Sequence, residues 1–415
     1  MSGLQPVRGT HDLLPEDMRH HRAVGERARD VAARYGYQLM ATPIFEFSEV
    51  FRRTLGETSD VVMKEMYSFA LRDDGAEITL RPENTASVAR AVMSNGLTQQ
   101  LPLKFFYDGP MFRHERPQKG RQRQFHQIGV ELFGVPEPLG DVEIIAVGAH
   151  ILEELGVLAR TRLELNTLGD TESRQAYRAA LVDYFTGHKE RLSRDSQERL
   201  DRNPLRILDS KNEGDREVVA DAPKFTDYLN QASQDFFGQV KDGLEALGIA
   251  YEYSPRLVRG LDYYCHTAFE FKTDDLGAQD TVMGGGRYDY LMETMGGPAM
   301  AGVGWAAGIE RLALLLEDAS APARPILVVP VGDAQERAAL TLTQELRKAG
   351  WTVELGYGGG LKKRMKRANR INARLALLLG EDELARRAAT LRDLDSGHQE
   401  EVPLDGLAER LAAVT

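Results

Sequence analysis

A single cysteine, Cys265, stands in this chain of 415 residues, which excludes an internal disulfide framework and favours a reducing compartment such as the cytoplasm. No apolar run approaches the roughly 20 residues that are needed to span a bilayer. The N-terminal segment MSGLQPVRGTHDLLPED has no apolar core of a secretion signal. The histidines and the cysteine show no zinc-ligand spacing, so we expect no metal site formed by protein ligands.

Common catalytic motifs are also absent. The sequence contains no G-x-x-x-x-G-K-[ST] phosphate loop and no G-x-S-x-G nucleophile elbow. Cys265 and His266 are adjacent, but neighbours on a strand point to opposite faces, so we expect a packed thiol rather than a nucleophile pair. The segment GGGR at 284–287 lacks the spacing of a dinucleotide site and is predicted to be a glycine-rich loop.

Charge is distributed unevenly along the chain. The net charge of −11 argues against indiscriminate binding of nucleic acid. Two local basic patches are nevertheless present, a loop at 113–123 and the segment LKKRMKRANR at 361–370. As a helix, the second patch places Lys362, Lys366 and Arg370 on one stripe. A solvated helix face would explain this stripe, but its place in a small terminal domain of an acidic protein favours contact with a phosphate backbone.

The stretch from Lys104 to Phe133 is predicted to form two aromatic-rich strands around the first basic loop. Alternate residues of a strand share a face, which places Gln127 and Glu131 on either side of Gly129 as a small floor with polar walls. A buried carboxylate is costly unless it is paired, so Glu131 requires a cationic or hydrogen-bond-donating partner. The opposite face is expected to be ordinary core, formed by His126, Ile128, Val130 and Leu132.

A basic loop beside a carboxylate-lined floor indicates two substrates, one polyanionic and one small and cationic. The alternative is an exposed hairpin with a charged turn. Arginines on separate predicted elements favour the first interpretation, because the planar guanidinium suits phosphate oxygens. Each of them alone would be a surface or salt-bridge residue, but together they indicate a triphosphate clamp: Arg113, Arg259 and Arg311. Nearby glycines would let a nucleotide lie against the backbone: Gly302, Gly304 and Gly308.

The length predicts two or three domains, and the shares of hydrophobic residues (42%) and charged residues (28%) are typical of a soluble globular protein. A helical pattern over 16–36 precedes a strand over 37–47, whose Pro43 indicates an edge, a bulge or a subunit boundary. Further along, Asp141 is expected to cap a helix over 143–155.

A helix is predicted to begin at about Thr85, after a short strand and a break at Pro82. Glu83 and Thr85 lie at this helix start. One interpretation gives them a role in binding, and the other is simple capping of the helix by Asn84 or Thr85.

The second half of the chain divides at a linker. Residues 171–250 are mostly helical and strongly charged, which predicts a helical insertion in a sheet-based domain. The segment APARP at 321–325 is typical of a linker. Beyond it, apolar strand patterns alternate with helical ones in a βαβαβ order, which predicts a parallel or mixed sheet.

Several motifs resemble those of histidyl-tRNA synthetases. FRHERPQKGRQRQFHQIGVELFG at 112–134 resembles motif 2 of that family, RGLDYY at 259–264 its histidine-specific element, and GVGWAAGIERL at 302–312 its motif 3. The resemblance extends in the family's order over nearly the whole chain, through RGTHDLLP, TLRPE, NPLRILDSK and LKKRMKRANRINARLALLLGEDE. RGLDYY together with a complete motif 2 makes the match specific.

The resemblance implies an α+β catalytic domain of the class II synthetase type, in which helices flank an antiparallel sheet. This domain would span 1–320, with the helical insertion at about 171–250, and an α/β anticodon-binding domain would span 325–415. The implied enzyme is a cytoplasmic homodimer with 16–50 at its interface and no membrane contact. It would activate L-histidine with ATP to histidyl-adenylate and transfer the histidyl group to the 3′ end of tRNA-His.

For ATP, the resemblance implies that Arg113 and Arg259 are the catalytic residues that hold the α-phosphate. Arg121 and Arg311 would bind the β- and γ-phosphates, and the adenine would be framed by Glu115 and Phe125. Mg²⁺ would bridge the phosphates rather than occupy a cage of protein ligands. No protein nucleophile is needed, because the carboxylate of the amino acid itself attacks the α-phosphate.

For histidine, the resemblance places Glu83, Thr85 and Gln127 around the α-amino group, with Arg113 and Arg259 nearby. Glu131 and Tyr264 would recognise the two imidazole nitrogens, with Tyr263 in the same pocket. A neutral imidazole has one donor and one acceptor nitrogen, which a carboxylate and a phenol can satisfy. The tRNA would be bound by residues in both basic patches: Arg121, Arg123, Lys362, Lys366 and Arg370.

One departure from the family pattern is Asn84, where family members usually have glycine. Asparagine tolerates positive φ better than other non-glycine residues, so we expect the loop geometry to be kept.

Two other functions are compatible with parts of this pattern. The first is the synthetase-like regulatory subunit of ATP phosphoribosyltransferase in histidine biosynthesis, but those proteins typically lack the anticodon-binding domain and keep the RGLDYY region poorly. The second is a stand-alone adenylating enzyme or amide ligase, against which the terminal basic domain counts.

Overall fold

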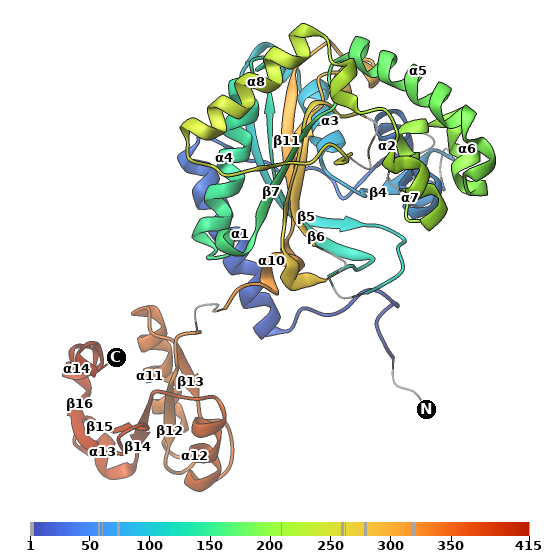
Figure 1. The fold of residues 1–415 in the computed structure, drawn as a ribbon. Helices are drawn as coiled ribbons and strands as arrows, with labels where there is room; N and C mark the ends of the chain where they lie inside the picture. The colour runs from blue at the N-terminus through green and yellow to red at the C-terminus, as the bar shows by residue number, and fades with distance from the viewer. Residues whose placement is uncertain are drawn as a thin grey trace. The chain divides into compact units, whose positions relative to one another are not determined.

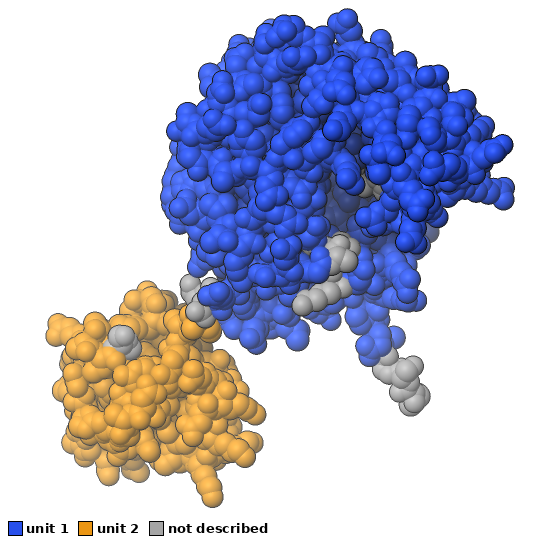
Figure 2. Space-filling model, viewed as in Figure 1, with its two compact units in different colours: residues 1–319 blue, residues 320–415 orange. Residues whose placement is uncertain are grey.

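The computed structural model describes residues 4–56, 59, 61–72, 75–118, 120–208, 210–258, 261, 263–277, 280–317 and 321–414. The chain divides into two compact units, residues 1–319 and 320–415, which Figure 2 distinguishes by colour. Among the residues that the structure describes, none of the helices combines the length and apolar character that a bilayer span requires.

An eight-stranded mixed sheet forms the centre of the first unit (Figure 1). Its six middle strands pair antiparallel, and the short strands at its edges pair parallel with their neighbours. In sheet order the strands are β1 (Gln38–Leu39), β5 (Leu103–Phe112), β6 (Gln124–Phe133), β11 (Gly302–Gly308), β10 (Thr281–Arg287), β9 (Cys265–Lys272), β7 (Arg162–Thr167) and β8 (Glu252–Tyr253).

Helices cover both faces of this sheet. On one face lie α1 (Pro15–Arg34), α4 (Pro138–Glu154) and α8 (Gln231–Ala246) (Figure 1). Their apolar side chains are buried in one cluster with those of β6 and β11. A second apolar cluster contains residues of β5 together with α2 (Ser48–Leu55), α3 (Thr85–Ser94) and α9 (Leu291–Thr294). The predicted class of fold, an antiparallel-centred sheet flanked by helices, is confirmed.

The region 37–47 does not form the single strand that was predicted. It forms β1 in the large sheet and β2 (Phe45–Phe47) in a separate three-stranded sheet with β4 (Glu77–Leu80) and β3 (Tyr67–Ala70). Pro43 lies in the break between the two strands. Proline has no N–H to donate to a ladder, which fits a chain that leaves one sheet and enters another.

The predicted helical character of 171–250 is confirmed, and its helices belong to two different apolar clusters. Helices α5 (Thr171–Gly187), α6 (Arg194–Arg202) and α7 (Glu213–Ala220) share an apolar cluster of their own. In contrast, α8 buries Phe237, Val240 and Leu244 in the main core under the large sheet. Charge patterning could not separate these helices, because both groups expose a charged face.

Two further predictions in this unit were wrong. Helix α4 begins at Pro138, and Asp141 pairs instead with Arg287, both fully buried. The GGGR segment belongs to strand β10 rather than to a loop. A Cβ on Gly285 would lie 2.1 Å from the carbonyl oxygen of Gly304, so glycine is needed there for the strands to approach. The packed thiol is confirmed, since Cys265 is buried and burial raises its pKa to about 12.

The second unit has a five-stranded sheet in the order β13–β12–β14–β15–β16. The predicted βαβαβ order is confirmed by β12 (Ile326–Pro330), α11 (Glu336–Lys348), β13 (Val353–Leu355), α12 (Leu361–Arg370) and β14 (Leu375–Leu379), whose strands pair parallel. An antiparallel hairpin that was not predicted, formed by β15 (Ala388–Asp393) and β16 (Gln399–Pro403), extends the sheet. The short helix α13 (Glu381–Ala385) precedes this hairpin, and α14 (Leu407–Val414) follows it.

Candidate active site

A cavity of about 450 Å³ in the first unit gathers most of the residues that the sequence singled out. Its wall contains carboxylates, a hydroxyl group, guanidinium groups and aromatic rings. The predicted site residues that line it are Glu83, Thr85, Arg113, Glu115, Arg121, Phe125, Gln127, Tyr263, Tyr264 and Arg311. They come from the start of α3, from β5 and β6 with their connecting loop, from the chain before β9 and from α10 (Ile309–Ala313).

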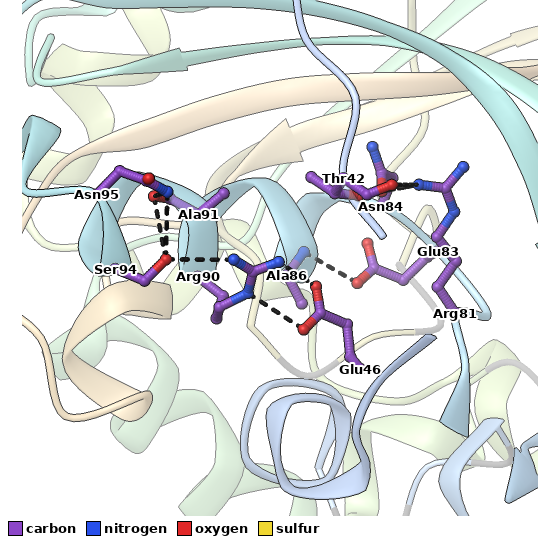
Figure 3. Close-up of polar contacts among 10 residues, drawn as sticks. All are labelled: Thr42, Glu46, Arg81, Glu83, Asn84, Ala86, Arg90, Ala91, Ser94 and Asn95. Atoms are coloured by element: carbon purple, nitrogen blue, oxygen red, sulfur yellow. Dashed lines mark hydrogen bonds and ion pairs between the residues drawn. The ribbon is translucent and has the colours of Figure 1, made fainter. Parts of the chain in front are cut away.

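Glu83 caps the N-terminus of α3, where Asn84 or Thr85 was the expected cap. Its carboxylate accepts a hydrogen bond from Thr85 N at 2.7 Å. It accepts a second one from Ala86 N at 3.0 Å (Figure 3). Burial raises the pKa of Glu83, and the two backbone N–H groups and the charge of Arg113 oppose this shift. Asn84 has φ −116° rather than the positive φ considered for it, so the turn does not require glycine.

Glu131 is fully buried on strand β6 and is not among the described residues that line the cavity. One of its oxygens accepts from Thr85 Oγ1 at 2.7 Å, and the other accepts a short hydrogen bond from the hydroxyl of Tyr288. Burial raises the pKa of Glu131 to about 8, although both of these hydrogen bonds lower it. The donor that Glu131 was expected to require is therefore present, and Tyr288 is a residue that the sequence analysis missed.

Two glycine predictions around Glu131 were wrong. A Cβ on Gly304 would lie 2.1 Å from Glu131 Oε2, and one on Gly302 would lie 2.5 Å from the Tyr288 ring. These glycines accommodate protein side chains, not a nucleotide. The floor at Gly129 is also occupied, because its Cβ would meet the Tyr107 hydroxyl at 2.3 Å. In the sequence, the only indication of a tyrosine beside Glu131 is the pair of glycines on strand β11, Gly302 and Gly304, which leave space for the Tyr288 ring.

A cluster of tyrosines stands beside Glu131. The ring centroids of Tyr263 and Tyr264 are 4.6 Å apart, and Tyr288 lies 5.6 Å and 6.3 Å from them. Arg174 of α5 donates to the carbonyl oxygen of Tyr264 at 2.7 Å, which fixes the backbone there. Burial raises the pKa of Tyr263 and Tyr288 well above the ordinary value, so their hydroxyls stay protonated and available as donors.

Three arginines on the cavity wall are held in place by neighbouring groups. Arg113 donates from Nε to Pro82 O at 2.9 Å, and its guanidinium carbon lies 5.4 Å from the Phe125 ring centre. Arg121 Nε lies 2.5 Å from Glu115 Oε2. Arg311 donates to Gly120 O at 3.1 Å and to Thr281 O at 2.6 Å. Its pKa is lowered by burial and by the charge of Arg121, so this pocket favours an anion.

Comparison with known proteins gives the family. The family model described as histidyl-tRNA synthetase matches residues 9–312, and the model described as anticodon binding domain matches residues 326–413. A histidine--tRNA ligase of Rhodospirillum rubrum is 62% identical over 413 residues, which cover 99% of each chain.

The chain belongs to the histidyl-tRNA synthetase family.

Other relatives agree with this assignment. A histidine--tRNA ligase of Gluconacetobacter diazotrophicus is 55% identical over the full length of both chains. The crystal structure of apo S. aureus histidyl-tRNA synthetase matches with a TM-score of 0.83 and 35% identity, covering 98% of this chain and 99% of that one. A Bacillus halodurans ATP phosphoribosyltransferase regulatory subunit/histidyl-tRNA synthetase, at 20% identity and a TM-score of 0.66, shares the fold.

Not every residue that the family resemblance selected lies in the cavity. Arg259 falls outside the described residues. Arg123 is half-buried below the loop and donates to Glu115 O at 3.2 Å and to Arg8 O at 3.3 Å. The remaining three, on helix α12 of the second unit, are exposed on one stripe, opposite buried Arg364 and Ala368: Lys362, Lys366 and Arg370. The amphipathic helix is thus confirmed, and its role as a tRNA contact stays a prediction.

His21, His126 and Glu310 form the one group of the described residues that is compact enough to share an ion. Glu310 already accepts from the backbone N–H of His126 at 2.9 and 3.0 Å and from its Nδ1 at 3.0 Å. The third member, His21, has its Nε2 atom 3.9 Å from Glu310 Oε1. We interpret the group as a hydrogen-bonded link that holds α10, and with it Arg311, against strand β6.

The buried acid Glu131 predicts a pH-dependent stability. Its pKa is about 8 in the folded protein against 4.5 ordinarily, so between these values only the folded chain keeps the proton. Stability must then fall as pH rises from about 4.5 through about 8. Glu131→Gln mimics the protonated form and should shrink the difference in Tm between pH 6 and pH 8.5 by several degrees. Exposed Glu49→Gln is the control, and an unchanged difference in Glu131→Gln would contradict the shift.

Proposed function

We propose that this protein activates L-histidine with ATP to histidyl-adenylate and then transfers the histidyl group to the 3′ end of tRNA-His. The observation that carries the proposal is the composition of one cavity. The buried side chains of Glu83 and Thr85 line it together with three arginines, Arg113, Arg121 and Arg311. A small cationic molecule and a polyphosphate can therefore lie side by side in it.

The first step needs alignment more than a reactive side chain. The histidine carboxylate oxygen bonds to the α-phosphorus of ATP while the bond to the bridging oxygen breaks and pyrophosphate leaves. Negative charge builds on the α-phosphate, where fixed positive charge lowers the barrier. We assign this role to Arg113, held by Pro82 and Phe125, together with Arg259. Arg121 and Arg311 bind the β- and γ-phosphates, and Glu115 and Phe125 frame the adenine.

The α-amino group of histidine is assigned to Glu83, Thr85 and Gln127. Gln127 supports this assignment independently, because its Oε1 atom is buried and has no protein partner. A buried acceptor without a donor costs about 1–3 kcal/mol. An ammonium group of the substrate would supply that donor.

The imidazole ring is assigned to Glu131 and Tyr264, with Tyr263 beside them. Burial favours the protonated form of Glu131, and a bound imidazole N–H would favour its ionised form. The ionised carboxylate has about four acceptor positions, of which Thr85 and Tyr288 use two, so capacity remains for the imidazole N–H. Analogues that lack either ring nitrogen would leave a buried polar group unpaired, which discriminates by roughly 10⁴.

Mg²⁺ is assigned to the phosphates of ATP. Two carboxylates on the cavity wall, those of Glu270 and Asp280, are of the oxygen-ligand type that this ion prefers, and Glu270 also pairs with Lys272. The ion would neutralise phosphate charge next to the arginines.

Histidine-dependent exchange of ATP and pyrophosphate, followed by charging of tRNA-His, tests the proposed function. Both reactions are expected. Absence of pyrophosphate exchange would favour a regulatory subunit of the ATP phosphoribosyltransferase type. Exchange without charging of tRNA would favour a stand-alone adenylating enzyme or amide ligase. The regulatory role is not favoured, because the ligases of R. rubrum and G. diazotrophicus match over the full chain and the anticodon-domain model matches residues 326–413.

The binding of tRNA is assigned to both units. We place the catalytic domain at 1–320 and the anticodon-binding domain at 325–415. The exposed stripe on α12 would contact the phosphate backbone near the anticodon, while Arg121 and Arg123 in the motif 2 loop would meet the acceptor end. A protein with this role in translation is expected in the cytoplasm.

A homodimer is supported by the three-stranded sheet. Its buried face is polar: Glu46 pairs with Arg90 of α3 (Figure 3), and Thr79 hydrogen-bonds Ser48 and Ser68. Its other face exposes aromatic side chains, with Phe45 55%, Phe47 60% and Phe69 47% exposed. A contiguous exposed aromatic face marks an interaction surface. Because β2 lies in the region 16–50, we propose that a second copy of the chain covers this face.

Charge on this aromatic face should separate the subunits. Phe47→Asp with Phe69→Asp is expected to convert the dimer to a monomer at micromolar concentration, because dimerisation would then bury carboxylates in place of apolar rings. Sedimentation velocity measures the change. Leu139→Asp, at an exposed leucine of α4, is the control and should remain dimeric. A parent protein that sediments as a monomer would contradict the assignment.

A further inference from the structure

Three buried polar side chains meet at the start of α3. Asn84 Oδ1 accepts hydrogen bonds from Thr42 Oγ1 at 2.7 Å and from Arg81 Nη1 at 3.0 Å (Figure 3). Arg81 Nη1 also lies 2.9 Å from the Thr42 hydroxyl, which closes a triangle. Asn84 is 1% exposed, Arg81 4% and Thr42 9%. We call these three side chains the clamp.

Arg81 anchors the clamp to the large sheet. Its Nε donates to Pro110 O on β5 at 2.9 Å, and its Nη1 donates to Thr42 O at 3.1 Å. A Cβ on Gly109 would lie 2.4 Å from Arg81 Nη2, so the strand leaves room for the guanidinium only because glycine is there. The clamp therefore ties the chain before β2 and the first turn of α3 to one fixed strand.

The residues on either side of Asn84 face the cavity. Glu83 and Thr85 both line it, whereas Asn84 is not among the described residues that do. The backbone of Asn84, at φ −116° and ψ −14°, is open to any residue type. Its side chain also makes no cap bond to the helix. Asparagine at this position is thus explained by the two hydrogen bonds that its oxygen accepts inside the clamp.

We propose that Asn84 is a positioning residue, which holds the turn at 82–85 so that Glu83 and Thr85 present their polar atoms to the α-amino group of histidine. This inference rests on the proposed function. Glycine at this position would leave the Thr42 hydroxyl without the acceptor that it has in the clamp, would remove one of the acceptors of Arg81 Nη1, and would loosen the turn. The side chain of Asn84 therefore fixes the backbone of the turn at 82–85.

Substrate-specific kinetics test the proposal. Asn84→Ala is expected to raise the KM for histidine about tenfold in pyrophosphate exchange, as the loss of one charge-assisted hydrogen bond predicts. The KM for ATP and kcat should stay within about twofold. Asn84→Asp keeps the acceptor oxygen and should bring the KM for histidine back to within about threefold of the parent. Asn95→Ala, at the other end of the same helix, is the matched control (Figure 3).

A histidine KM within twofold of the parent in Asn84→Ala, or an equal rise in the KM for ATP, would overturn the proposal, as would a failure of Asn84→Asp to restore binding. The clamp itself is tested without substrate. Because Asn84→Ala and Thr42→Val both remove the hydrogen bond between Thr42 Oγ1 and Asn84 Oδ1, the loss of Tm in the double variant should be smaller than the sum of the two single losses. Additive losses would overturn the clamp. If the parent lacks histidine-dependent exchange, the proposed function fails while this Tm result still stands.

Discussion

Replacing Arg113 with alanine is expected to lower the rate of histidine-dependent pyrophosphate exchange by about 10²–10³-fold. Removing one preorganised donor from developing negative charge typically costs this much. Arg113 is preorganised in this structure, because its Nε donates to Pro82 O at 2.9 Å and its guanidinium lies over Phe125. The guanidinium of Arg113 is therefore already oriented before ATP binds, and the loss of rate in the variant should appear in kcat.

Arg113→Lys separates charge from geometry. It keeps the charge but loses the planar fork, so we expect it to recover only part of the rate. Arg386→Ala, which breaks an exposed ion pair with Glu401 in the second unit, should exchange at the parent rate. If Arg113→Ala retains more than a third of the parent kcat, the assignment to the α-phosphate is wrong.

Reversing the charge of the α12 stripe should separate the two reactions of the proposed cycle. Lys362→Glu with Lys366→Glu is expected to lower kcat/KM for charging of tRNA-His by about 100-fold, since each residue would change from attracting to repelling a phosphate. Pyrophosphate exchange should remain at the parent rate, because these exposed residues belong to the second unit.

The matched control for this stripe is Arg337→Glu with Lys348→Glu, which makes the same change of net charge on exposed positions of α11. That variant should charge tRNA within about threefold of the parent. An equal loss in both double variants would mean that total charge matters rather than a specific contact. A parallel loss of exchange in the α12 variant would argue against a separate tRNA-reading domain.

Local patterns predicted much of the fold correctly. Strand β6 alternates as expected, with Ile128, Val130 and Leu132 in the main core while Phe125 and Phe133 belong to the cluster on the other face. Helix α12 spans the predicted 361–370. Both depend on residues close in sequence, whose periods of 2 and 3.6 are visible without any tertiary information.

The errors arose where distant segments decide the structure. Asp141 was taken as a helix cap, but it pairs with Arg287, which lies 146 positions away. Tyr288 was missed because it reaches Glu131 only through the pairing of β6, β11 and β10. Register places Gly304 opposite both Glu131 and Gly286, which opens the space for the phenol. No local motif encodes such a space, since it is created by the absence of side chains on a neighbouring strand.

The crystal structure of the protein with bound histidine tests the central claim most directly. We expect the imidazole ring to lie within hydrogen-bond distance of Glu131 and Tyr264, with the α-amino group beside Glu83 and the Oε1 atom of Gln127. A ring bound elsewhere, with Glu131 still engaged only by Thr85 and Tyr288, would contradict it.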